Sequence, residues 1–359
     1  MFDVTRATRR AAAAVLVAAL ALLPSVACSD GDGDGREGGG GDGAVTGGDE
    51  APGDGGSNTG GSSAADEGPF AVGHRSLTLV DDSRPTDAVP DVLPARPDRT
   101  IEVEVVYPTR GDAGPEPTGE ILTPGAAVLD AEPAAGAFPL VVWAHGFNGR
   151  GEQGLGIAER WARAGYVVAL PTFPLSREGI AISDDLVNQP GDVTFVVDAL
   201  TGPEPADDAL AGVIDPERLA VGGHSLGAAT VFGVAYNSCC IDERIDATIT
   251  VAGGTLPFEG GTYDEAPPTP MLLVHGEQEQ TVPVAAGDAM FELVEAPIWY
   301  LRPADADHIT VFTGEPGRLF NAAALTFLDT HLRDGDPAAL DALGGEITAG
   351  GIAGWQVKP

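Results

Sequence analysis

The sequence predicts an α/β protein whose central, mostly parallel sheet is covered by helices on both faces. Apolar runs typical of buried strands alternate with helical patterns along residues 71–359, and this alternation is the signature of a parallel sheet. The run at residues 139–144, Pro-Leu-Val-Val-Trp-Ala, is apolar throughout, as in a strand buried on both faces. Ligands bind such sheets beyond the carboxyl ends of the strands, so we expect the functional residues there.

Each element follows from a local pattern. Residues 101–107 place acidic side chains between apolar ones, as a strand with one exposed face does, and residues 152–164 form a helical pattern that ends at Gly165. The expected strands are residues 77–80, 101–107, 139–144, 166–170, 219–222, 247–252, 271–274 and 298–301, and the expected helices are residues 152–164, 191–200, 226–236 and 318–332.

The N-terminal segment predicts export. Three arginines precede an apolar run at residues 11–23, which is too short to span a bilayer (about 20 residues) but suits a signal peptide. The following Ser-Val-Ala-Cys resembles a lipoprotein cleavage site, so residues 1–27 are assigned to a signal peptide and a lipid is expected on Cys28. Ordinary secretion with an unmodified Cys28 is the alternative.

Residues 28–70 predict a disordered tether, because they are rich in glycine and acidic side chains. A folded catalytic domain, residues 71–359, would then be held at the cell surface by the lipid, or be released if no lipid is attached. The lipid on Cys28 is the only membrane contact that we expect.

The charge of the chain excludes one class of function. The sequence contains 54 acidic and 19 basic residues, for a formal net charge of −35. Nucleic-acid binding depends on neutralising phosphates with basic side chains, so no nucleic-acid partner is expected.

Two adjacent cysteines follow the helix at residues 226–236. Neighbouring Cα atoms lie about 3.8 Å apart, which is closer than in most disulfides. Export favours a disulfide between Cys239 and Cys240, whereas the strain favours two buried thiols, and both alternatives stay open. No third ligand stands nearby at a regular spacing, so no metal is expected.

A nucleophile motif lies between an apolar strand and a helix. Residues 223–227, Gly-His-Ser-Leu-Gly, fit the pattern Gly-x-Ser-x-Gly, in which the serine is held on a sharp turn that flanking side chains would obstruct. This context predicts Ser225 as the nucleophile of a hydrolase. A glycine-rich turn with an incidental serine is the alternative.

The serine needs a general base, and the order along such chains is serine, acid, histidine. His275, His308 and His331 follow Ser225. His308 lies just beyond the last expected strand, where the base belongs, and is therefore preferred. His275 directly follows a strand, and His331 is near the end of the last helix.

Two backbone amides are candidates for stabilising the oxyanion of the substrate. One is the N–H of Leu226, the residue after the nucleophile. The other is the N–H of Phe147, in the loop that follows the strand at residues 139–144. The Phe147 ring would then lie over the bound acyl group.

These motifs resemble those of the alpha/beta-hydrolase superfamily. The resemblance is carried by residues 142–149, 159–168, 192–200 and 222–227 and covers residues 71 to about 332. Within the superfamily the chain is similar to bacterial platelet-activating-factor acetylhydrolase-like, dienelactone-hydrolase-like and cutinase-type polyester hydrolase proteins. The resemblance implies an alpha/beta-hydrolase fold and a serine esterase without metal or organic cofactor. It implies no large lid domain, because residues 253–270 are too few for a helical cap.

The same resemblance suggests the acid of the triad. Residues 275–283 are similar to the His-Gly-x-x-Asp-x-x-Val-Pro loop of this superfamily and place Glu279 where the aspartate usually stands. Glutamate can orient a histidine equally, although its longer side chain must fold back. Glu277 and Asp305 are the alternative acids.

These residues together predict an exported serine carboxylic-ester hydrolase acting on lipid-like or polyester-like esters. Another acyl hydrolase, a thioesterase or peptidase, would use the same groups. A surface binding protein that keeps the fold without activity is the third reading.

Overall fold

The computed structural model describes residues 69–115, 117, 120–125 and 127–359. The predicted signal peptide and nearly all of the predicted tether lie outside the described residues. Phe70, the last residue assigned to the tether, packs edge-on against Phe138 with ring centroids 5.3 Å apart. The packed fold therefore includes Phe70.

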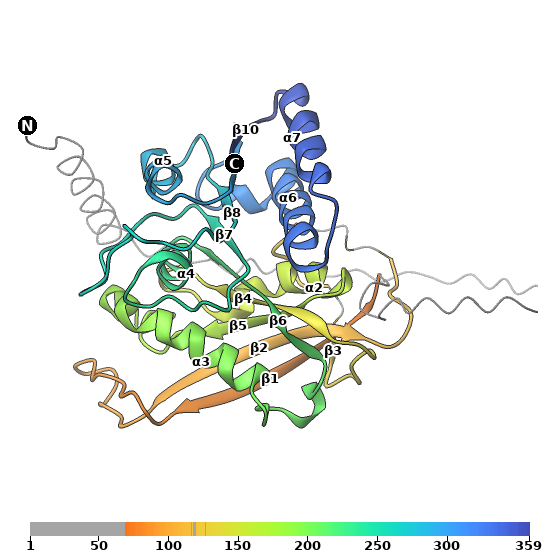
Figure 1. Cartoon of the computed structure of the whole chain (residues 1–359). Coiled ribbons are helices and arrows are strands. Elements are labelled where there is room, and N and C mark those ends of the chain that lie inside the picture. Colours follow the sequence, from red (N-terminus) through yellow and green to blue (C-terminus); the bar gives the residue numbers. More distant parts are fainter. Residues whose placement is uncertain (1–68, 116, 118–119, 126) are drawn as a thin grey trace, which may run out of the picture.

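One sheet of ten strands forms the centre of the described part of the chain (Figure 1). Its strand order is β10-β9-β8-β7-β6-β4-β5-β2-β1-β3. The strands are β1 (Ala71–Asp81), β2 (Arg99–Thr109), β3 (Val128–Leu129), β4 (Phe138–Ala144), β5 (Val167–Thr172), β6 (Ile214–His224), β7 (Ala247–Val251), β8 (Met271–Val274), β9 (Ile298–Pro303) and β10 (Ala353–Lys358). Strands β5, β4, β6, β7, β8 and β9 are parallel, whereas β2 joins β5, and β10 joins β9, in antiparallel register.

Helices cover both faces of the sheet (Figure 1), because its central strands are apolar on both sides. The α-helices are α2 (Leu155–Arg163), α3 (Gln189–Thr201), α4 (Leu226–Tyr236), α5 (Val284–Leu293), α6 (Gly314–Leu332) and α7 (Ala338–Gly350). One apolar cluster joins the sheet to α2, α6 and α7, and another joins its opposite face to α3 and α4. Every residue of β4 and β5 is buried between these layers.

The predicted elements are found, with strands that are often longer than expected, and four elements were not predicted. The two-residue β3, helices α5 and α7 and strand β10 were missed. Short 3₁₀ turns cover Gly151–Gly154, Ser183–Asn188, Asp208–Leu210 and Thr310–Phe312.

The connection from β7 to β8 begins at the carboxyl end of the parallel strand β7. All residues between β7 and β8 are described, and this connection contains neither helix nor strand, as expected for a fold without a large lid. Among the described residues, none of the helices has the length and apolar character required to cross a bilayer.

Candidate active site

Ser225 lies on the sharp turn between β6 and α4. Its backbone has φ 57° and ψ −119°, a left-handed conformation that costs a residue with a side chain about 1–3 kcal/mol. The turn is held because the Ser225 N–H donates to the carbonyl oxygen of Val251 (2.9 Å) and its carbonyl accepts from Ala229 (3.2 Å). The strained residue is the predicted nucleophile.

Both glycines of the motif are required by close packing. A Cβ on Gly223 would lie 2.5 Å from the backbone of Gly227, and a Cβ on Gly227 would overlap the carbonyl oxygen of Ala144 at the end of β4. The pattern Gly-x-Ser-x-Gly therefore follows from the approach of the turn to the neighbouring strand.

The loop after β4 lies directly against the serine. A Cβ on Gly146 would be 3.2 Å from the Cβ of Ser225. In the described part of the chain the Phe147 N–H has no acceptor, whereas the next N–H, of Asn148, donates to Ser176 (2.7 Å). Leu226 is the first residue of α4, so its N–H has no acceptor within the helix. Both amides are thus free to bind an oxyanion.

His145 holds this loop in place. Its Nδ1–H donates to the carbonyl oxygen of Gly146 (2.7 Å), and its Nε2 accepts from the N–H of Phe173 (3.0 Å). Burial lowers the pKa of His145 to about 4, so the ring is neutral at physiological pH. It acts as a fixed link between the loop after β4 and the loop after β5.

The predicted base and acid are in contact. The Nδ1–H of His308 donates to Oε2 of Glu279 at 2.8 Å. They come from the loops after β9 and β8, which run side by side because Gln278 donates to the carbonyl oxygen of Ala306 (2.9 Å). The other ring nitrogen of His308, Nε2, is left to accept a proton.

The Glu279 side chain folds back onto its own loop. Its Oε1 accepts from the N–H groups of Thr281 (2.6 Å) and Val282 (3.0 Å), which uses the extra length of glutamate over aspartate. Burial opposes its ionisation, but the hydrogen bonds from His308 and from these two amides outweigh burial and lower the pKa of Glu279. Glu279 is therefore a carboxylate at neutral pH.

The alternative bases lie elsewhere. His275 is fully buried, and its Nε2–H donates to the carbonyl oxygen of Val282 (2.7 Å). His331 packs between Trp299 and Phe327, with ring centroids 5.2 Å and 4.6 Å away. In the described part of the chain neither histidine forms a hydrogen bond or ion pair with Glu279.

The alternative acids are also displaced from His308. Glu277 pairs with Arg302 (2.8 Å), and Asp305 is exposed. The geometry brings Glu279, and neither of these, to the imidazole.

His224, the residue before Ser225, connects the nucleophile turn to His308. Among the described residues Ser225 Oγ has no hydrogen-bond partner, and catalytic hydrogen bonds are often long before substrate binds. The ring of His224 lies 4.6 Å from the ring of His308, and its Nε2–H donates to the His308 carbonyl oxygen (2.9 Å). His308, the predicted base, therefore lies beside the turn that carries Ser225.

A cavity of about 410 Å³ opens beside these groups. Its polar edge includes His145, Gly146 and His224, and its wall is otherwise mostly apolar. The apolar lining residues are Leu122, Trp143, Ile157, Ile309 and Phe312. The volume lies within the range of about 300–1,000 Å³ that is typical of pockets for small molecules.

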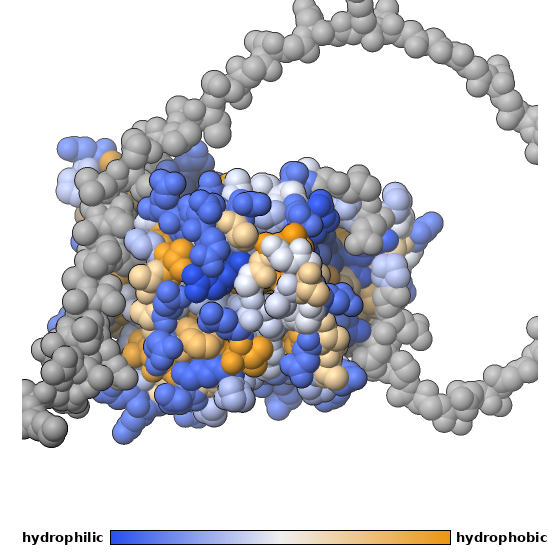
Figure 2. Space-filling model, turned by 90° about the horizontal axis from the view of Figure 1, so that it is seen from above, coloured by the Kyte–Doolittle hydropathy of each residue, from blue (hydrophilic) through white to orange (hydrophobic). Residues whose placement is uncertain are grey.

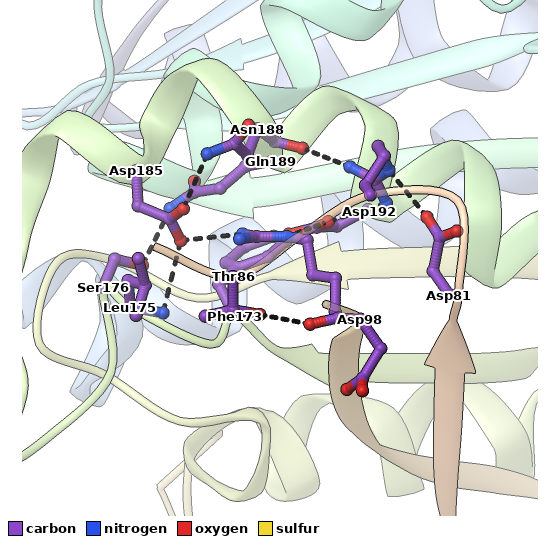
Figure 3. Close-up of polar contacts among 12 residues, drawn as sticks. Asp81, Thr86, Asp98, Phe173, Leu175, Ser176, Asp185, Asn188, Gln189 and Asp192 are labelled. Carbon is purple, nitrogen blue, oxygen red and sulfur yellow. Dashed lines mark hydrogen bonds and ion pairs between the residues drawn. The ribbon is translucent and has the colours of Figure 1, made fainter. Parts of the chain in front are cut away.

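A buried ionic cluster anchors the loop after β5, as Figure 3 shows. Arg99, 1% exposed, donates to Asp192 (2.6 and 2.7 Å) and to Asp185 (2.8 Å). Gln189 of the same region donates to Ser176 (2.7 Å). The loop that accepts a hydrogen bond from Asn148 and donates one to His145 is therefore anchored to β2 and α3.

Phe173 and Leu175 of the loop after β5 are buried. Phe173 belongs to the apolar cluster of α3 and α4. Leu186 of the same loop contacts the cluster around Leu226 and Phe147.

Cys239 and Cys240 form a disulfide, which resolves the alternatives that the sequence left open. No three His, Cys, Asp or Glu side chains of the described residues are grouped to hold a metal ion.

Comparisons with known proteins agree with this architecture. The solved structure of a ferulic acid esterase from Streptomyces cinnamoneus superposes with a TM-score of 0.55 and 21% identity, covering 77% of this chain and 94% of that structure. At this identity the likeness shows the fold alone. The protein has an alpha/beta-hydrolase fold.

Sequence relatives cover only part of the chain. The uncharacterized protein YfhR of Escherichia coli K12 is 23% identical over 132 residues, 32% of this chain and 46% of YfhR. YfhR of Salmonella typhimurium is 26% identical over 146 residues, 33% of this chain and 50% of that protein. The chain thus spans about half the length of the curated relatives it matches. No protein-family model matches the sequence.

Proposed function

We propose that the protein is an exported serine carboxylic-ester hydrolase that works through an acyl-enzyme. The observation that carries the proposal is the hydrogen bond between His308 Nδ1 and Glu279 Oε2 (2.8 Å), on loops that lie next to a serine with the backbone of a nucleophile turn. The fold of a ferulic acid esterase supports it.

The reaction follows from the roles of these groups. Ser225 Oγ attacks the ester carbonyl carbon while His308 Nε2 takes the hydroxyl proton, and Glu279 stabilises the resulting imidazolium. The N–H groups of Phe147 and Leu226 hold the oxyanion. The ester C–O bond then breaks, and His308 gives its proton to the leaving alkoxide.

Water completes the cycle. His308 takes a proton from the water that attacks the acyl carbonyl, and returns it to Ser225 Oγ as the carboxylic acid leaves. The ester and water are the reactants in this sequence of steps.

The cavity supports esters with a bulky apolar part. Trp143 and Phe312 give it an aromatic wall, and Ile309, 55% exposed, stands at its surface side. Without a helical cap, the remainder of a lipid-like, polyester-like or arylalkenoyl ester can extend into solvent. Attachment to the cell surface through Cys28 would present this open site to such substrates.

Hydrolysis of p-nitrophenyl esters from acetate to palmitate, together with methyl ferulate, tests the proposal. We expect hydrolysis by the wild type, best for acyl groups that fill the cavity, and a loss of at least about 10³-fold in Ser225→Ala. The proposal fails if Ser225→Ala keeps the wild-type rate. Thioester and amide substrates in the same panel distinguish the other acyl hydrolases.

A further inference from the structure

His224 is a half-buried polar residue at the edge of the cavity, and the reaction above gives it no role. It is the residue between the first glycine and the serine of the nucleophile motif, at the last position of β6. Burial lowers its pKa to about 3, so it is neutral and cannot compete with His308 as the base.

The imidazole of His224 contacts both loops that complete the site. Its Nε2–H donates to the His308 carbonyl oxygen (2.9 Å), and its ring lies 5.0 Å from the Phe312 ring. On the other side a Cβ on Gly146 would lie 3.5 Å from His224 Nδ1. The ring therefore sits between the oxyanion loop and the loop that carries the base.

Apart from the hydrogen bond from His224, the contacts of His308 are mainly those of its ring. Glu279 sets the orientation of the imidazole, and Asp307 holds the following turn by accepting from the N–H groups of Ile309 (3.0 Å) and Thr310 (2.8 Å). Neither contact joins the His308 backbone to the nucleophile turn. The hydrogen bond from His224 does, and it comes from the residue next to Ser225.

We propose that His224 is a positioning residue, which sets the distance between His308 and Ser225 through the hydrogen bond from its Nε2–H to the His308 carbonyl. The inference rests on the proposed function. A base displaced by about 1 Å can lose about 10²-fold in rate, so a single link of this kind has a measurable effect on kcat.

A matched pair of variants isolates the hydrogen bond. Glutamine places its amide N–H about as far from Cβ as histidine places Nε2–H, and methionine has a similar length without a donor. Both His224→Gln and His224→Met remove the ring and its contact with Phe312. The two variants therefore lose the same packing, and they differ in the hydrogen-bond donor. Urea unfolding of both variants checks that they are folded to the same extent.

The kinetic expectation concerns kcat and not KM. We expect kcat of His224→Met to be about 10-fold to 10²-fold below that of His224→Gln, with KM values for p-nitrophenyl butyrate that agree within about twofold, since an interaction that matters only to the reacting geometry leaves ground-state binding unchanged. Equal kcat values in the two variants overturn the inference.

A second measurement does not depend on activity. Hydrogen exchange of the backbone amides of residues 304–312 should be faster in His224→Met than in His224→Gln, because the loop loses its link to β6. Equal exchange overturns the inference even if no ester is hydrolysed. Loss of activity in Ser225→Ala together with equal kcat and exchange in the pair would leave the proposed function standing and reject the role of His224 alone.

Discussion

At the scale of single residues, the two carboxylate oxygens of Glu279 bind different partners. Glu279 uses Oε2 for His308 and Oε1 for the amides of Thr281 and Val282. The same carboxylate therefore orients the His308 imidazole and fixes its own loop. This arrangement explains how a glutamate can stand where an aspartate is usual.

Glu279→Gln tests this double role. The amide oxygen can still accept from the loop, but the NH₂ group would face His308 Nδ1–H, so the imidazole would adopt the other tautomer and lose its acceptor toward Ser225. We expect kcat to fall by about 10²-fold to 10⁴-fold with little change in stability. Glu277→Gln, in the same loop but paired with Arg302, is the control and should stay within about twofold. Similar activities in the two variants would exclude Glu279 as the acid.

At the scale of elements, the turn between β6 and α4 is defined by what it approaches. Gly227 contacts the end of β4, and the helix α4 begins directly after the serine. The approach of β4 leaves no room for a Cβ at Gly227. Local sequence and long-range packing thus impose the same conformation.

Gly227→Ala should destabilise the protein by about 1–3 kcal/mol, because its methyl group would overlap the backbone of Ala144. Gly345→Ala is the matched control. It lies in α7, where nothing stands within 4 Å of a Cβ, and should stabilise by about 0.5–1 kcal/mol. Urea unfolding followed by circular dichroism measures both. Equal effects of the two substitutions would contradict the packing argument.

Most elements that position the site were predictable, because their patterns are local. The apolar run of β4 and the glycines around Ser225 need no partner to be recognised. Helix α7 was missed because Gly344 and Gly345 indicate a break. Gly344 is used instead to let the Trp355 ring of β10 pack against the helix. That requirement arises only in the folded molecule.

The same distinction holds for the site. The places of Ser225 and His308 follow from the order of elements, and Glu279 from a loop pattern. The link from His224 to the His308 carbonyl and the one from His145 to Phe173 join segments far apart in the sequence. No local signal distinguishes these histidines from ordinary buried ones.

At the scale of the whole molecule, acidity and buried histidines set the response to pH. The face seen in Figure 2 is largely hydrophilic, with apolar residues in several separate groups. The formal net charge of the full sequence is −35, which favours solubility. Acidification should lower the free energy of unfolding, because His145 and His224 resist protonation in the folded protein.

Stability should fall as the pH drops below about 6.5. Burial lowers the pKa of His145 to about 4 and, with the nearby His308 and His275, that of His224 to about 3. Unfolded histidines titrate near 6.5, so between these values the unfolded chain binds protons that the folded chain does not. Each histidine then costs about 2 kcal/mol between pH 7 and pH 5.

His224→Gln removes one of these titrations. The decrease in the free energy of unfolding between pH 7 and pH 5 should be about 2 kcal/mol smaller than in the wild type, as measured by urea unfolding at the two pH values. Parallel pH dependences in the two proteins would mean that His224 titrates normally in the folded state.

The proposed mechanism requires Ser225 to form the covalent bond to the substrate. Its most direct test is mass spectrometry of the protein after reaction with diethyl p-nitrophenyl phosphate, which transfers a diethylphosphoryl group to an activated serine. We predict a single added group, located by proteolysis on the peptide that contains Ser225 and absent from Ser225→Ala. Labelling of another residue, or equal labelling of Ser225→Ala, would contradict the account.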